Sequence, residues 1–250
     1  MRARHRHLNP RAAGATLVLD SRYITGLSDG DPISTWDDKS GNGYSPTASS
    51  TARPIYKTSI QGGNAIARFD GSNDALYYNA NLSTVDALSL LCVAKWDATN
   101  TRRPLFDAKN AAGNFKHFTI ETNTFTSTGD NYDFYSSNNA LEGNVAVTTN
   151  FRVISIAADT TNGNSIINNT TYKVDGSTNT LTLRTGNGNY QQLTNVNGFV
   201  VGSFNDNGPT YGLFFDGDIG TIAAFPAQIT GALMKRLEHA AAYCFKISCN

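Results

Sequence analysis

The chain consists of short apolar runs rich in β-branched and aromatic residues, separated by clusters of Asn, Gly, Asp, Ser and Thr. Runs of this composition are typical of β-strands, and the polar clusters between them are typical of turns. Many strands spaced in this way predict an all-β fold, a two-sheet antiparallel jelly-roll sandwich. The clearest runs are 15–19, 88–96, 115–121, 151–157, 198–202 and 219–225.

Two of these runs, 88–96 and 151–157, are apolar on both alternating faces. A strand with two apolar faces is buried on both sides, so both runs are expected in the middle of a sheet. Cys92 lies inside the first run and is expected to act as a small buried hydrophobe. Trp36 and Trp96 each end an apolar run and are expected to anchor the core.

One α-helix is predicted, over 231–243. Ile229, Leu233 and Leu237 recur at four-residue spacing and give the segment a single apolar stripe, with which it would pack on the sandwich. No proline interrupts the segment, and Thr230 stands where a hydroxyl could cap the free amides of the first turn.

The chain shows no linker, internal repeat or low-complexity tract, which predicts one sandwich domain over 14–250 preceded by an arm, 1–13. Twenty basic and twenty acidic residues cancel, so no overall field favours nucleic acid or an anionic membrane. The arm is locally basic, which suits docking onto an acidic partner surface. Its cations are Arg2, Arg4, Arg6 and Arg11.

No run approaches the roughly 20 apolar residues that a membrane span requires. A signal peptide is not expected either, because polar residues interrupt the place where its apolar region would lie. Cys244 and Cys249 could pair, but three cysteines without a secretion signal favour reduced thiols.

Three motifs set an aromatic residue against an Asp/Gly/Asn turn: Trp-Asp-Asp-Lys-Ser-Gly-Asn-Gly at 36–43, Phe-Asp-Gly-Ser-Asn-Asp at 69–74 and Phe-Asp-Gly-Asp-Ile-Gly at 215–220. Their order and spacing across 14–247, with a helix last, resemble the laminin-G-like, concanavalin A-like lectin/glucanase jelly roll. That superfamily includes lectins, adhesion modules, glycoside hydrolases, and decoration and tail proteins of bacteriophages. The resemblance therefore implies the fold and leaves several functions open.

The resemblance to glucanases can be tested against the supply of carboxylates. Retaining members of the family use a Glu-x-Asp-x-Glu strand, because two carboxyl groups must flank the scissile bond. The only glutamates are Glu121, Glu142 and Glu238, and their spacing cannot form such a strand. We therefore expect the chain not to be an enzyme. A hydrolase with Asp catalysts stays as an alternative, ranked after the two binding functions given below.

A calcium site at the rim of the sandwich is one alternative for the acidic turns. Calcium takes six to eight oxygen ligands from carboxylates, amides and carbonyls. In the other reading, these side chains cap turns and brace strand ends. The candidate ligands are Asp70, Asn73, Asp74, Asp216 and Asp218.

A glycan site would need aromatic rings beside polar loops, and four tyrosines are candidates: Tyr132, Tyr135, Tyr190 and Tyr211. Along 131–135, Tyr132 and Tyr135 fall on opposite faces, so one of the two faces must belong to the core.

The resemblance and the basic arm together predict a non-catalytic phage virion subunit, a capsid decoration or cement protein anchored by its arm. It would be made in the host cytoplasm, would form a homo-oligomer such as a trimer, and could bind glycans on its outward loops. The alternative is a free, secreted, lectin-like carbohydrate-binding module with calcium at its rim.

Overall fold

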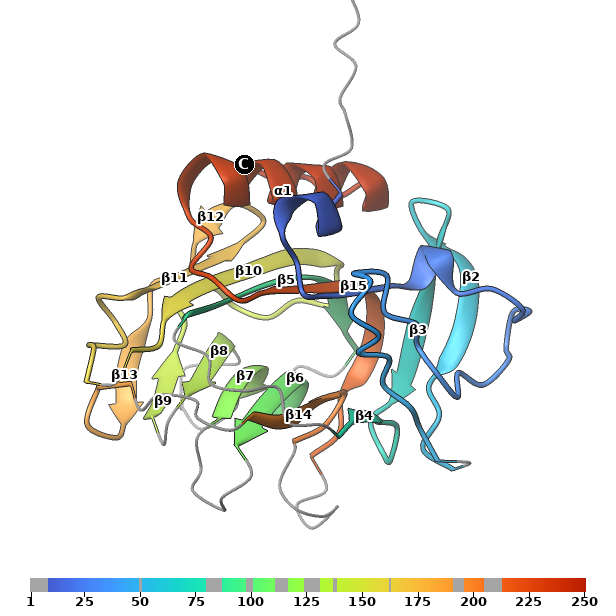
Figure 1. The fold of residues 1–250 in the computed structure, drawn as a ribbon, viewed down its shortest axis with the longest axis horizontal. Helices are drawn as coiled ribbons and strands as arrows, with labels where there is room; N and C mark the ends of the chain where they lie inside the picture. The colour runs from blue at the N-terminus through green and yellow to red at the C-terminus, as the bar shows by residue number, and fades with distance from the viewer. Residues whose placement is uncertain are drawn as a thin grey trace, which may run out of the picture.

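The computed structural model describes residues 9–49, 51–79, 87–97, 101–110, 117–123, 131–136, 139–161, 163–190, 196–204 and 213–250. Two antiparallel sheets and a C-terminal helix make up most of it, which confirms the predicted all-β class. Figure 1 shows the sheets as two stacked layers, with the helix on the far side of one of them.

The first sheet, here called sheet A, has eight strands in the order β12-β11-β10-β5-β15-β3-β2, with β1 paired to β15. Its strands are β1 (Leu17–Asp20), β2 (Ile55–Gln61), β3 (Asn64–Asp70), β5 (Ala87–Trp96), β10 (Arg152–Asp159), β11 (Thr170–Val174), β12 (Ser177–Thr178) and β15 (Asp216–Phe225).

The second sheet, sheet B, has seven strands in the order β13-β9-β8-β7-β6-β14-β4. Its strands are β4 (Leu76–Tyr78), β6 (Arg103–Asn110), β7 (His117–Asn123), β8 (Asn131–Ser136), β9 (Asn139–Glu142), β13 (Thr182–Thr185) and β14 (Val196–Val201).

Each of the six predicted runs corresponds to a strand, namely β1, β5, β7, β10, β14 and β15, although 115–116 lie outside the described residues. The prediction for the two doubly apolar runs is confirmed, because β5 lies between β10 and β15, and β10 between β5 and β11. Cys92, Trp36 and Trp96 are fully buried, as predicted.

The main core lies between the two sheets. The Trp96 ring at its centre packs edge-on against Tyr132 of β8, at a centroid distance of 5.3 Å, and against Phe215, at 5.1 Å. Aromatic rings favour such edge-to-face packing, because it sets the positive ring edge against the negative face. Trp96 thus joins sheet A to sheet B.

The helix α1 (Gly231–Phe245) covers the outer face of sheet A, over β10 and β5 (Figure 1). Its apolar stripe packs there through Met234, Leu237 and Phe245. Thr230 occupies the N-cap position but its side chain caps no helix amide, so that detail of the prediction is wrong. Gly231 has a φ of 60° and turns the chain after Thr230, and the preceding amide of Ile229 is held by Ser89 Oγ instead.

The end of α1 is fixed by the hairpin of β2 and β3. Gln61 Nε2 donates to the carbonyl of Phe245 at 2.8 Å, and Asn64 Nδ2 donates to that of Cys244 at 2.6 Å. These bonds satisfy carbonyls that a helix end leaves without a partner. The Phe245 ring lies against Gly220 of β15, where a Cβ would come within 2.5 Å of the ring. Among the described residues, no helix is long and apolar enough to cross a membrane.

Candidate functional site

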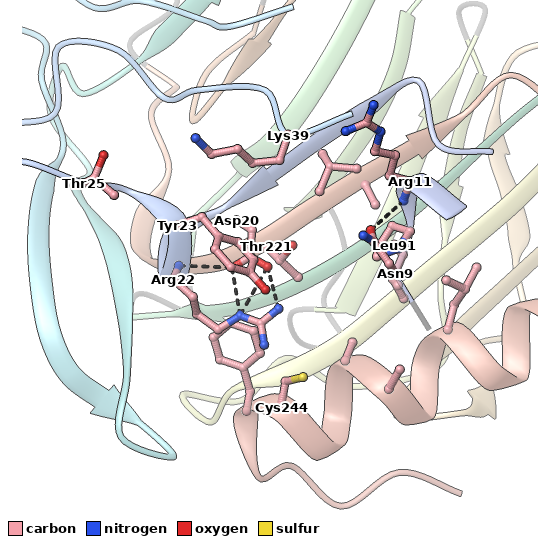
Figure 2. A pocket seen from close by; sticks show the side chains of 17 residues that line it. Asn9, Arg11, Asp20, Arg22, Tyr23, Thr25, Lys39, Leu91, Thr221 and Cys244 are labelled. Carbon is pink, nitrogen blue, oxygen red and sulfur yellow. Dashed lines mark hydrogen bonds and ion pairs between the residues drawn. The ribbon is translucent and has the colours of Figure 1, made fainter. Parts of the chain in front are cut away.

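A groove runs along α1 on the outer side of sheet A, and two short segments also border it, one beside the end of α1 and one on the side away from the helix (Figure 2). The first segment is the 3-10 helix η2 (Ser21–Tyr23), which follows β1 directly. The Ser21 hydroxyl is buried and contacts the carbonyls of Ala65 and Gly220, at 2.6 and 2.8 Å. This anchor leaves Arg22 and Tyr23 at the surface beside the end of α1.

The second segment is the motif at 36–43, whose conformation is set by Asp38. Its carboxylate accepts the amides of Val18, Ser40 and Tyr44 at 2.8 to 3.0 Å. Asp side chains stabilise turns through such bonds to nearby amides. Because one of these amides belongs to β1, the turn is tied to that strand and carries Lys39 to the edge of the groove.

The α1 groove defined by these segments has a volume of about 920 Å³. Its floor is apolar and includes Leu91 and Ala223 of sheet A, and Leu237 contributes to the helix side. Figure 2 shows Lys39 and Arg11 on the side away from α1, and Arg22 with Cys244 on the side of the helix.

A second, more open hollow of about 550 Å³ adjoins the α1 groove. Both are lined by Arg22 and Cys244, so they meet at these two residues. Tyr23 lines the first and Tyr243 the second, and they are the two most exposed large aromatic side chains of the described chain, at 55% and 64%. Together the two depressions form one surface, here called the paired hollow.

Arg22 stands at the centre of the paired hollow in a fixed position. Its guanidinium donates through Nε and Nη2 to the carboxylate of Asp20, which also accepts the Arg22 amide. This bonding to Asp20 raises the pKa of Arg22 further above its ordinary value. The guanidinium also lies over the rings of Tyr23 and Phe245, at 5.6 and 5.2 Å from their centroids.

The four tyrosines predicted for a glycan site are not brought together. Tyr132 and Tyr190 are buried in the core, which leaves neither ring a face for a sugar, so the prediction is wrong for these two. Tyr132 alternates with Tyr135 along β8, and its face is the one that the core takes. Tyr135 lies on the outer face of sheet B, with the Arg102 guanidinium 5.4 Å from its ring centroid. Tyr211 lies outside the described residues.

The outer face of sheet B carries carboxylates that no sequence motif indicated. Glu121 of β7 and Asp133 of β8 are direct cross-strand neighbours, and both are buried. Glu121 is bonded to Arg102 Nε at 2.8 Å, and Asp133 accepts the amide of Gly143 at 3.1 Å. Burial, together with the charges of Glu121 and Glu142, raises the pKa of Asp133 to about 8.

Three of the five predicted calcium ligands, Asp70, Asn73 and Asp74, lie in the turn at 70–74, and two of them cap it. Asp70 Oδ1 accepts the amides of Ser72 and Asn73, at 2.8 and 3.2 Å, and Asp74 Oδ2 accepts the amide of Asp70 at 2.9 Å. Burial and the charge of Asp70 raise the pKa of Asp74 to about 6. The side chains of Asp70 and Asp74 therefore cap the turn, as the alternative to a calcium site predicts.

The remaining two candidates differ in position. Asp216 pairs with Asp70 across β15 and β3, and it packs against the turn, since a Cβ on Gly71 would lie 2.8 Å from its own. Asp218 is buried and bonded to Arg68 Nε at 2.7 Å, with Lys95 Nζ at 3.2 Å, so its oxygens already have cationic partners. Among the described residues, no group of three acidic, His or Cys side chains is arranged to hold a metal ion.

Of the four arginines assigned to the basic arm, only Arg11 is described. It begins the 3-10 helix η1 (Arg11–Ala13) and lines the α1 groove. Arg2, Arg4 and Arg6 lie outside the described residues.

Sequence reasoning missed the paired hollow altogether. A signal existed for Tyr243, because this large aromatic residue falls outside the apolar stripe of its helix and must face solvent. Tyr23 and Arg22 follow the first predicted strand without any distinguishing pattern. Only the fold shows that this strand end lies beside the end of a helix more than 200 positions later.

Solved structures of known proteins resemble the fold of this chain, although no family model and no curated protein sequence matches it. Among solved structures it is similar to domain 4 of AbnA, a GH43 extracellular arabinanase from Geobacillus stearothermophilus, in complex with arabinotriose. The TM-score is 0.58 at 13% identity, over 91% of this chain and 98% of that one.

It is also similar to the Trypanosoma rangeli sialidase, with a TM-score of 0.59 at 11% identity, over 94% of this chain. The match spans 34% of the sialidase, about a third of that protein. At these identities the likeness concerns the fold. It supports a jelly-roll-like β-sandwich architecture for this chain.

Proposed function

We propose that this chain is a non-catalytic carbohydrate-binding β-sandwich whose sugar site is the paired hollow. The observation that carries the proposal is the position of Tyr23 and Tyr243, which expose their rings in adjoining depressions on either side of Arg22. An exposed ring offers an apolar face to the C–H groups of a sugar, and a fixed polar group beside it can bind hydroxyls. In the paired hollow, the Arg22–Asp20 pair is that group.

Two further observations support the proposal. Domain 4 of the arabinanase, a similar sandwich, was solved in complex with arabinotriose. The lining of the α1 groove contains a single carboxylate, Asp20, and both of its oxygens are bonded to Arg22. Glycoside hydrolysis ordinarily needs a pair of carboxyl groups flanking the bond, so the groove suits binding better than hydrolysis.

Retention of the full chain on an array of immobilised oligosaccharides tests this function. Tyr23→Ala removes one ring and should weaken retention about tenfold, because burying roughly 50 Å² of apolar surface between a sugar and the ring contributes about 1.3 kcal/mol. Tyr23→Phe keeps the ring and should bind almost as the parent does.

Ile167→Ala is the matched control, because Ile167 is also exposed but does not line the paired hollow. Retention that is equal in Tyr23→Ala and Ile167→Ala would place any sugar site elsewhere. A parent chain that binds no oligosaccharide on the array contradicts the function itself.

The virion role predicted from the basic arm stays a prediction. It is tested by replacing Arg2, Arg4 and Arg6 with Gln in the full chain and measuring association with large assemblies at low and high salt. Loss of association in the variant supports anchoring by the arm, and identical free monomers contradict it. The same experiment bears on where the protein is located. Association with large assemblies favours a virion, and free monomers favour the alternative of a secreted protein.

A further inference from the structure

The α1 groove carries an excess of positive charge in a chain whose charges balance overall. Three cationic side chains line it, Arg11, Arg22 and Lys39, against the one carboxylate of Asp20. The whole chain carries equal numbers of basic and acidic residues. The excess of positive charge is therefore a property of this groove, and it is complementary to an anion.

The three cations differ in how far they are already satisfied. Arg22 is held by both oxygens of Asp20 and contributes little net charge of its own. Lys39 Nζ is 3.1 Å from Asp37, but both side chains are well exposed to solvent, at 36% and 60%. An ion pair of this kind is weak and can exchange its partner for a ligand.

Arg11 is the cation best placed to accept a new partner. Its residue is exposed, and its guanidinium lies over Gly41, where a Cβ would be 3.1 Å from Nη2. Among the ion pairs of the described residues, none involves Arg11. Arg11 and Lys39 share the groove side away from α1, and Arg22 lies nearer the helix (Figure 2).

We infer that the sugar bound in the α1 groove is acidic, with carboxylate or sulfate groups that contact Arg11 and Lys39 while a ring lies against Tyr23. This inference rests on the proposed carbohydrate-binding function and names the class of its ligand. An acidic sugar fits because it joins an anion to a ring with an apolar face. The groove offers cations and an exposed tyrosine to match these two features.

The test uses matched pairs on the array that differ only in charge. These are sialyllactose with its methyl ester, and tetragalacturonate with its fully methyl-esterified form, so that each pair keeps the same sugar rings and differs in the charge of the carboxylate. The full chain should retain the acidic member of at least one pair and release the neutral member. Raising the salt from about 0.05 M to about 0.5 M should weaken this retention, because exposed charges are then screened.

Two charge variants locate the effect. Lys39→Gln and Arg11→Gln should each weaken retention of the acidic sugar about fivefold, as expected for one exposed charge contact. Lys235→Gln is the matched control, because it removes one exposed charge from α1 outside the groove. Both groove variants should fold normally, since neither side chain is buried.

The outcomes separate this inference from the proposed function. Equal retention of neutral and acidic members, with loss in Tyr23→Ala, overturns the acidic sugar and keeps the carbohydrate site. Equal binding by Lys39→Gln, Arg11→Gln and Lys235→Gln also overturns it. If no member of any pair is retained by the parent chain, and nothing else on the array is, both the inference and the proposed function fail.

Discussion

The outer faces of the two sheets differ in kind, although their inner faces share one core. The outer face of sheet A is apolar and lies under α1, through Leu91, Val93, Ala223 and Phe225. The outer face of sheet B bears polar side chains, among them Asp107, Thr119, Glu121 and Asp133, all of them buried. Their neighbours Phe118, Ile120, Tyr132 and Phe134 face the core, which fixes the alternation.

The two faces reach stability by different means. An apolar face must be covered, and α1 is the part of the chain that covers sheet A. The groove exists because α1 lies over β10 and β5, which leaves the part of the face over β1 and β15, beside the helix, uncovered. On sheet B the polar side chains bond to one another, as Thr119 does to Asp107 at 2.6 Å. Glu121 and Asp133 are neighbouring carboxylates on this face, and repulsion between their charges lowers the stability of the fold.

The largest expected effect lies on the apolar side. Leu237 is buried between α1 and sheet A, so Leu237→Ala should lower the free energy of unfolding by about 2 to 5 kcal/mol. Urea denaturation followed by circular dichroism measures the change. Lys235→Ala, two residues away and exposed, should differ from the parent by less than about 0.5 kcal/mol. A similar small change in both variants would mean that α1 adds little to the stability of the domain.

The sheet A side was also the more predictable of the two from sequence. The apolar stripe through Leu233 and Leu237 indicates a helix that must be buried on one side, and the doubly apolar runs at 88–96 and 151–157 indicate strands covered on both faces. These patterns are local and depend on side-chain spacing alone. The helix and the two central strands followed directly from them.

The sheet B side and the paired hollow could not be predicted in this way. The segment 131–135 mixes aromatic and polar residues, and its register with β7 decides that Asp133 faces Glu121. Cross-strand pairing joins residues from separate strands, so no local pattern contains it. For the same reason Tyr132 was assigned to a sugar site although it packs on Trp96 in the core.

The second prediction concerns the pH dependence of the polar face. The pKa of Asp133 is raised to about 8 in the folded chain, against about 3.9 for an ordinary Asp. The folded state therefore holds one proton more than the unfolded state between these values, and the unfolding free energy falls as the pH rises from about 4 to about 8. In Asp133→Asn this contribution is absent, while an amide oxygen can still accept the Gly143 amide.

Asp133→Asn should therefore be stabilised relative to the parent by on the order of 3 to 4 kcal/mol more at pH 8 than at pH 5. Denaturation of both proteins at the two pH values measures this difference. Ile167→Ala, an exposed and uncharged change, should follow the pH dependence of the parent. Parallel curves for Asp133→Asn and the parent would show that the two states of the chain bind this proton equally.

The smallest expected effect tests whether a carboxylate under the apolar cover behaves like those on sheet B. Glu238 of α1 is buried, accepts the Ser155 hydroxyl at 2.5 Å, and lies 3.7 Å from Lys173 Nζ. Its Oε2 makes no hydrogen bond, so Lys173 is a charge partner without one. Unlike Asp133, Glu238 faces a cation, and removal of its charge should therefore destabilise the fold.

Glu238→Gln keeps the shape and the contact with Ser155 but loses the ion pair. We expect a loss of about 1 kcal/mol, because Lys173 is partly exposed and water can solvate its ammonium once the pair is gone. Urea denaturation at pH 7 measures it, with Lys235→Gln as the exposed control on the same helix. A gain in stability instead would mean that burying Glu238 costs more than its pairing with Lys173 returns. The two outer faces would then share the same electrostatic penalty despite their different covers.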